Sequence, residues 1–135
     1  MAYTFARVSA VAGLKRGDYR LEGKRARLRT VEKGGKEMLV WLHHEAEEFL
    51  DTYLAVAGIE GADEALFPTL DKTHRMSGDP LTRRDILRIV KERCRAAGLS
   101  ATFCDHAFRG TGITVFPQNG GALEAAQDMA NSWPE

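Results

Sequence analysis

The order of apolar and polar side chains divides the chain into helical and extended segments. Near the start, apolar residues recur at helical spacing up to Gly13, a natural helix stop: Phe5, Val8, Val11 and Ala12. Residues 43–59 place apolar positions on one side and acids on the other, which predicts a second helix. Asp105 is suited to cap a later helix, and residues 122–131 predict a final short one.

Residues 82–98 give the clearest helical pattern. Thr82 is a good N-cap with Asp85 three residues later, and Gly98 suits the C-terminal end. The apolar residues of this segment share one face: Ile86, Ile89, Val90, Cys94 and Ala97. Basic residues form a stripe on the other face, at steps of four, three and four: Arg84, Arg88, Lys91 and Arg95.

Extended structure is predicted between the first two helices. Arginine alternates with smaller or apolar residues along residues 25–30, which is typical of a half-exposed strand with a basic face. The pair Gly34 and Gly35 accepts the positive φ of a tight turn, and residues 38–42 then return as an apolar strand. Residues 19–21 can begin a further strand. The result is a β-hairpin with lysines at its tip.

These elements predict a mainly α-helical fold with a small antiparallel hairpin or three-stranded sheet, of the α+β class. Residues 58–80 contain several Gly and two Pro and predict a loop. A length of 135 residues favours a single domain, 1–135. The expected core residues are Leu14, Leu39, Trp41, Phe49, Tyr53, Leu66, Phe67, Ile86, Ile89, Val90, Phe108 and Ile113.

A formal net charge of zero hides an uneven distribution of charge. Residues 1–42 carry ten Lys and Arg against four acids, a balance of +6, and residues 66–110 carry +4. Residues 43–65 carry −7 and residues 111–135 carry −3. Because attraction of a phosphate ligand depends on the local field, the neutral sum does not exclude a nucleic-acid ligand.

Other classes of protein are disfavoured. No apolar run approaches the roughly 20 residues that span a membrane, and the N-terminus has no secretory pattern. Cys94 and Cys104 lack CxxC spacing, so free thiols and a cytoplasmic location are expected. Cys104 and His106 have no further ligands at metal-binding spacing, so neither a metal nor another cofactor is expected.

Four segments carry a resemblance to a known family. They are, in chain order, "FARVSAVAGLKRGD", "VEKGGKEMLV", "DHAFRGTGIT" and "NGGALEAAQDMAN". They resemble the first-arginine segment, the lysine hairpin, the His-x-x-Arg box and the following helix of the tyrosine recombinase (phage integrase) family. The resemblance covers nearly the whole chain and corresponds to the family's catalytic domain. It implies DNA recombination and DNA integration, the chemistry of mobile elements.

The resemblance assigns roles to four residues. Arg7 and Arg109 would clamp the non-bridging oxygens of a scissile DNA phosphate, for which a planar guanidinium is suited. Lys33 would protonate the leaving 5′ oxygen from the hairpin tip. His106 would hydrogen-bond the phosphate or assist proton transfer. Positions three apart share a helix face, so His106 and Arg109 can reach one phosphate.

Contacts to duplex DNA are implied for the basic stripe and the hairpin, which would bind the phosphate backbone through Lys36, Arg84, Arg88, Lys91 and Arg95. Each assignment has a structural alternative. Arg7 can pair with an acid at the edge of the core, and Lys33 can be a solvated turn residue. His106 can be a structural group near a helix start, and the basic stripe can be a solvated face.

The sequence departs from the family pattern at its end. Ser132 stands where the family has His or Trp, and Trp133 fits only with a shift of one residue. The nucleophilic tyrosine expected further on is missing, because the tyrosines are Tyr3, Tyr19 and Tyr53. The chain therefore resembles a catalytic domain truncated at both ends.

Three hypotheses follow. The first is a DNA-binding remnant of a site-specific recombinase, unable to cleave DNA alone because covalent strand transfer needs a nucleophile, unless a partner donates a tyrosine. The second is a non-catalytic protein that associates with full-length recombinases. The third is a folded fragment without function. Missing flanking helices would expose apolar surface, so self-association is expected.

Overall fold

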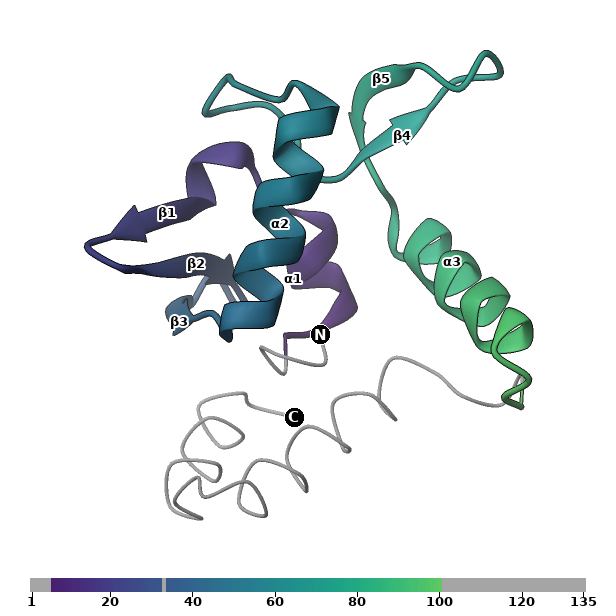
Figure 1. Ribbon diagram of the computed structural model, residues 1–135, viewed down its shortest axis with the longest axis horizontal. Helices are drawn as coiled ribbons and strands as arrows, with labels where there is room; N and C mark the ends of the chain where they lie inside the picture. The colour runs from purple at the N-terminus through teal and green to yellow at the C-terminus, as the bar shows by residue number, and fades with distance from the viewer. Residues whose placement is uncertain (1–5, 33, 101–135) are drawn as a thin grey trace.

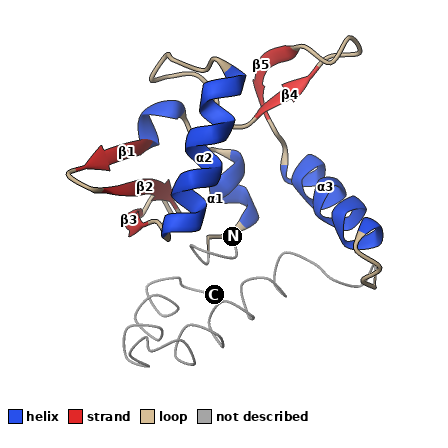
Figure 2. Cartoon of the chain, in the orientation of Figure 1, coloured by secondary structure: helices blue, strands red, loops and turns tan. Residues whose placement is uncertain are grey.

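The computed structural model describes residues 6–32 and 34–100 (Figures 1 and 2). The described elements are, in order, α1 (Val8–Ala12), the 3-10 helix η1 (Arg16–Asp18), β1 (Tyr19–Glu22), β2 (Arg25–Val31), β3 (Glu37–Trp41), α2 (His44–Ala57), β4 (Pro68–Leu70), β5 (Met76–Pro80) and α3 (Arg83–Ala96). Helices thus combine with small antiparallel sheets, and the predicted α+β class is confirmed.

The strands β1, β2 and β3 form one antiparallel sheet in that order. Alternation along β2 divides its side chains between two faces. Ala26, Leu28 and Thr30 are buried on the inner face, which packs against α1 and α2. The arginines between them lie on the outer face, as the sequence pattern predicted.

The core lies between this inner face, α1 and α2, and its buried cluster comprises Leu14, Tyr19, Ala26, Leu28, Leu42 and Leu66. The backbone of Leu66 forms hydrogen bonds to the segment after α1 and to α2, and so links these two parts of the core. The Leu66 amide donates to the carbonyl of Leu14 at 2.9 Å, and the Tyr53 hydroxyl donates to the carbonyl of Leu66 at 2.9 Å. The predicted burial of Leu14, Leu66 and Ile86 is confirmed.

The prediction of core residues was wrong for Leu39, Trp41 and Phe49. Leu39 and Trp41 are exposed because they lie opposite Arg29 and Arg27 on the outer face of the sheet. The run from 38 to 42 is apolar throughout, so it carries no alternation from which the faces could be read. Phe49 is 68% exposed on α2. Tyr53, Phe67, Ile89 and Val90 are half-buried, and Phe67 packs against the core cluster. Phe108 and Ile113 lie outside the described residues.

The loop predicted for residues 58–80 contains the β4–β5 hairpin (Figure 1), so that prediction was wrong for this part. Its turn is held by Asp71, whose Oδ1 accepts from the Thr73 amide at 2.7 Å and the Arg75 amide at 3.0 Å. Hydrogen bonds from Thr73 and Arg75 hold the pKa of Asp71 below its usual range. Every residue of β5 is exposed, so no apolar alternation marked the strand in the sequence.

The predicted caps are largely confirmed. Thr82 and Asp85 form a reciprocal capping box at the start of α3, in which each side chain accepts from the other residue's amide. The helix ends at Ala96 with Ala97 as cap, and Gly98 follows with a φ of 71°, one residue beyond the expected position. Gly13 caps α1, which starts at Val8 after the extended residue Arg7.

Thr82→Ala is expected to lower the free energy of unfolding by about 1 kcal/mol, because it leaves a helix amide without its side-chain acceptor. Hydrogen bonds from Thr82 lower the pKa of Asp85. A carboxylate with a depressed folded-state pKa stabilises above its unfolded pKa and loses that contribution as pH falls through the folded value. The difference in the free energy of unfolding between wild type and Thr82→Ala should therefore become smaller at acid pH.

Urea denaturation at neutral and acid pH measures this difference. Thr52→Ala is a matched control, because Thr52 lies inside α2 and its hydroxyl donates only to the carbonyl of Glu48. That substitution should be neutral or slightly stabilising at both pH values. Equal losses of stability in the two variants would contradict a special role for the cap.

Candidate functional site

Of the four residues predicted to be catalytic, Arg7 is the one that falls in the described part of the chain. Lys33, His106 and Arg109 lie outside the described residues. The site is therefore built from Arg7 and from the residues on either side of Lys33.

Arg7 stands immediately before α1 in an extended conformation, with φ −68° and ψ 150°. Its carbonyl accepts from the amide of Val11 at 3.1 Å, which anchors it to the first turn of the helix. Its side chain is 20% exposed, and its Nε lies 4.0 Å from Oε2 of Glu32. The guanidinium thus pairs with an acid at the edge of the core, which is the structural alternative foreseen for Arg7, and keeps part of its surface accessible.

Glu32 marks the start of the hairpin turn between β2 and β3. Its amide donates to the carbonyl of Lys36 at 2.8 Å, and its carbonyl accepts from the amide of Gly35 at 3.0 Å. Gly34 and Gly35 have φ values of 85° and 78°, the left-handed region that glycine occupies at no steric cost. The structure thus brings Arg7 to the base of the turn that contains Lys33.

Sequence reasoning missed Glu32, although a signal was available. Side chains at even positions of β2, from Ala26 to Thr30, point inward. Continuing the same alternation places Glu32 inside as well, and its side chain is only 1% exposed. An acid at a buried position of a strand needs a partner, and a basic residue near the core edge was the obvious candidate.

The basic face predicted for residues 25–30 is present but largely neutralised. Arg29 contacts Oδ1 of Asp18 through Nε at 2.9 Å and Oε1 of Glu37 through Nη1 at 3.0 Å. Arg27 pairs with Glu22. Because acids of η1, β1 and β3 pair with these guanidinium groups, this face is a weaker candidate for phosphate than α3.

The basic stripe of α3 is exposed along its length, at Arg84, Arg88, Lys91 and Arg95. Arg88 pairs with Glu92 one turn later at 3.1 Å, an exposed ion pair of little energetic weight. The other three form no salt bridge with any acid among residues 6–32 and 34–100. Lys36, beside the hairpin turn, is exposed too.

Two tyrosines are described, and the hydroxyl of each is engaged. Tyr19 is buried, and its hydroxyl donates to Oδ1 of Asp51 at 2.7 Å. Burial first, and then the hydrogen bond to Asp51, raises the pKa of Tyr19. Burial also raises the pKa of Tyr53. A nucleophilic tyrosine needs an accessible, readily deprotonated hydroxyl, and neither residue provides one.

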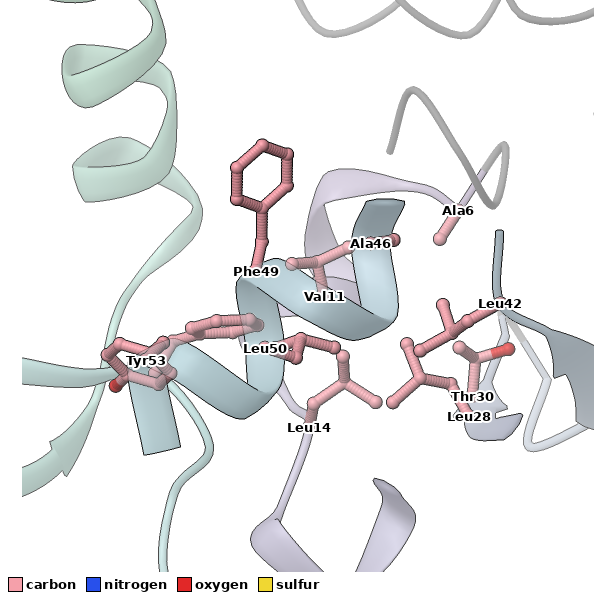
Figure 3. Close-up of a pocket in the computed structure, with 11 residues that line it drawn as sticks. Ala6, Val11, Leu14, Leu28, Thr30, Leu42, Ala46, Phe49, Leu50 and Tyr53 are labelled. Carbon is pink, nitrogen blue, oxygen red and sulfur yellow. The ribbon is translucent and has the colours of Figure 1, made fainter. Parts of the chain in front are cut away.

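A pocket of about 330 Å³ lies between α1, α2 and the inner face of the sheet. Figure 3 shows Leu14, Leu28 and Leu50 meeting at its centre, with Thr30 at one side. The Oγ1 atom of Thr30 is a buried polar atom without a hydrogen-bond partner among residues 6–32 and 34–100. The pocket is an extension of the apolar core, and none of the described residues that line it is charged.

Two further features of the described residues bear on function. In the part of the chain that the structure describes, no three His, Cys, Asp or Glu side chains gather in a way that could hold a metal ion. Among the described helices, none combines the length and the apolar character that crossing a lipid bilayer requires.

Comparisons of the sequence with known proteins converge on one group. The model of the phage integrase family matches residues 1–131. The tyrosine recombinase XerC of Pelobacter propionicus is 32% identical over 123 residues, which is 91% of this chain and 38% of that protein. The tyrosine recombinase XerD of Staphylococcus haemolyticus is 30% identical over 97 residues, 72% of this chain and 32% of that protein. The chain spans about a third of the length of these curated relatives.

Solved structures agree on the fold. The XerA recombinase superposes with a TM-score of 0.74 at 22% identity, covering 95% of this chain and 44% of that one. A XerH site-specific recombinase, bound to its difH substrate in a pre-cleavage complex, gives a TM-score of 0.71 at 22% identity. That match covers 95% of this chain and 36% of the XerH chain.

Proposed function

Because this chain belongs to the phage integrase family, we propose that it is a DNA-binding part of a site-specific tyrosine recombinase catalytic domain, which serves DNA recombination and integration by descent. Its ligand is the phosphate backbone of duplex DNA, and it acts in the cytoplasm without a cofactor. The observation that carries the proposal is the position of Arg7, partly exposed at the base of the turn containing Lys33.

The proposed grip uses fixed cations. A guanidinium remains charged at any working pH and donates two parallel hydrogen bonds to a phosphate. Arg7 supplies one such group, with Lys33 in the adjoining turn and, from the family motif, His106 and Arg109. Charge that accumulates on a phosphate in its transition state would strengthen these contacts.

A second set of contacts comes from α3. The exposed face of α3 carries Arg84, Lys91 and Arg95. Contacts from these three residues to the DNA phosphate backbone would position the protein along the duplex without reading its base sequence. Each phosphate contact releases condensed counterions, so the affinity is expected to fall steeply with salt.

Cleavage is outside the proposed activity of these 135 residues alone. Covalent strand transfer stores the energy of the broken phosphodiester in a phosphotyrosine, which Arg and Lys cannot form. The hydroxyls of Tyr19 and Tyr53 are engaged in the fold. A tyrosine supplied by another subunit would complete the site.

Association with a full-length recombinase, or with a second copy, is the alternative function. The observation in its favour is that Phe49 and Val56 are both exposed and lie seven residues apart on α2, so they share one face. Capture of a recombinase in the absence of DNA, together with no affinity for DNA, would favour this alternative.

The proposal is tested by measuring duplex-DNA affinity at several salt concentrations. Wild type should bind at low salt. A variant with Arg84, Lys91 and Arg95 replaced by alanine should bind more weakly, and the slope of log K against log salt should become shallower by about one for each lost contact. The matched control replaces Lys24, Lys72 and Arg75, which removes the same charge from the β1–β2 and β4–β5 turns.

The outcomes separate three explanations. A smaller loss in the control than in the α3 variant supports a specific phosphate-binding face. Equal losses would indicate attraction by total charge alone. Absence of binding by wild type at low salt would contradict the proposed function and would favour the alternative of association with a protein partner.

A further inference from the structure

We propose that the outer face of the β1–β2–β3 sheet binds the exposed side of α2 from a second copy of this chain, so that copies join head to tail. This inference goes beyond DNA binding, and it gives self-association two defined surfaces. It uses none of the residues proposed to contact phosphate, so either proposal can fail without the other.

The outer face of the sheet, here called the sheet face, carries an exposed apolar strip. Val31, Leu39 and Trp41 are all exposed. In the strand register Leu39 lies opposite Arg29 and Trp41 lies opposite Arg27, and Val31 follows these arginines at the next outward position of β2. Apolar side chains that gather on a surface and are rimmed by polar ones indicate a contact site for another macromolecule.

Two arginines of the sheet face are available to an acid from another molecule. Arg20 and Arg25 form no salt bridge with any acid among residues 6–32 and 34–100. Arg20 donates from Nε to a backbone carbonyl at 3.0 Å, and the guanidinium of Arg25 lies 5.2 Å from the ring centroid of Trp41. Tryptophan and arginine are the residues that most often dominate the binding energy of protein interfaces.

A hollow of about 260 Å³ opens on the same face. The described residues that line it are Asp18, Arg20, Arg27, Arg29 and Leu39. Its one acid is already engaged, because Asp18 accepts from Nε of Arg29 at 2.9 Å. A side chain that enters the hollow therefore meets guanidinium groups and a leucine, which suits a glutamate better than a basic residue.

The exposed side of α2, here called the helix stripe, has the complementary chemistry. It consists of Glu45, Glu48, Phe49, Thr52 and Val56, which recur at helical spacing and are all exposed. No Lys or Arg occurs in residues 43–65. Carboxylates beside large apolar side chains on one surface match guanidinium groups beside large apolar side chains on the other.

The two surfaces fit each other in size but cannot meet within one copy. Three strands about 4.8 Å apart make a face about as wide as the roughly 10 Å diameter of a helix. The other side of α2 packs on the core cluster through Ala46, Leu50 and Leu54, and the inner face of the sheet bounds that cluster. The helix stripe and the sheet face thus lie on opposite sides of the core, so each added copy presents a further surface for growth.

The charge of the chain favours a second copy as the partner. Its formal net charge is zero, so copies do not repel each other as strongly charged proteins do. The contact joins residues 1–42, with a balance of +6, to residues 43–65, with a balance of −7. Because one helix on a small sheet buries little area, the association is expected to be weak and reversible.

Sedimentation velocity over a concentration series, without DNA, measures the association. Wild-type species should grow beyond a dimer as the protein concentration rises. Raising the salt from about 0.05 M to about 0.5 M should weaken this association, because it screens the exposed charges. Trp41→Thr and Val56→Lys should each lower the association constant about thirtyfold, the scale of an interface hot spot.

Met76→Thr and Leu70→Lys are the matched controls on the β4–β5 hairpin. Met76 is 42% exposed and Trp41 is 47% exposed, and Leu70 is an exposed apolar residue like Val56. Each control makes the same kind of change outside both surfaces, so it should associate as wild type does. Losses in the controls equal to those in the two variants would overturn the proposal.

Mixing the two variants tests the head-to-tail arrangement. Trp41→Thr lacks a working sheet face and Val56→Lys lacks a working helix stripe, so neither should associate alone. An equimolar mixture retains one intact surface of each kind, and it should form a dimer that grows no further. Wild-type association in one of the variants alone, or a mixture that stays monomeric, would reject the contact.

Thermal unfolding shows whether each variant is folded. Both substituted side chains are exposed, so the folded state should be retained; should Trp41→Thr fail to fold, Leu39→Thr removes a neighbouring side chain of the same face. Wild type that remains a monomer at every concentration would also reject the contact. Duplex-DNA affinity decides the proposed function separately.

Discussion

Leu66→Ala is expected to lower the free energy of unfolding by about 2–5 kcal/mol, the usual cost of removing a buried leucine side chain and leaving a cavity. Leu66 is fully buried in the core cluster. Its neighbours in that cluster, Leu14 and Leu28, already border a pocket of about 330 Å³, so the core holds empty volume before the substitution adds more. Because small domains are stable by only about 5–15 kcal/mol, this single change removes a large share of the total.

Urea denaturation followed by circular dichroism measures the effect. Leu70→Ala is the matched control, since Leu70 lies four residues later in β4 and is exposed. Its expected change is about 0.5 kcal/mol or less. A similar small change in Leu66→Ala would mean that the segment after α2 does not hold the core together.

The fold could be predicted from the sequence wherever hydrophobic periodicity or a helix-capping pair was present. Arginines at every second position of β2 gave the strand and both of its faces, and Thr82 with Asp85 gave the start of α3. The apolar strand β3 carried no period, so Trp41 was assigned to the core when it lies outside. The β4–β5 hairpin was missed because side-chain hydrogen bonds of Asp71 make its turn, and its strands bury little.

The residues of the candidate site were named from the sequence, whereas their surroundings were not. Family resemblance located Arg7 and the turn at Lys33, but a motif cannot show which side chain supports them. The contact between Arg7 and Glu32 joins residues 25 positions apart, and such contacts depend on how α1 packs against β2. Only the inward alternation of β2 indicated that Glu32 would be buried, and the sequence offered Arg7 as a residue able to pair with an acid without showing which acid it would be.

A polypeptide of these 135 residues is expected to form no covalent adduct with a nicked suicide DNA substrate, even where it binds that DNA. The physical reason is the state of the two tyrosines that the structure describes, Tyr19 and Tyr53. Attack on phosphorus needs a hydroxyl that reaches the phosphate and loses its proton, and burial and hydrogen bonding raise the pKa of Tyr19 and hold its oxygen against Asp51. With the hydroxyls of Tyr19 and Tyr53 engaged in the fold, strand transfer by either of them is expected to be slower by many orders of magnitude.

Denaturing gel electrophoresis and mass spectrometry measure the adduct, with a full-length tyrosine recombinase on its own site as the positive control. An adduct on Tyr19 or Tyr53 would require either hydroxyl to leave its partner and the core to open, so it should vanish in Tyr19→Phe or Tyr53→Phe. Such an adduct would contradict the prediction directly. Cleavage that appears only on mixing with a full-length recombinase, with the adduct on that partner's tyrosine, would instead show that Arg7 and the Lys33 turn still act on phosphate when a nucleophile arrives in trans.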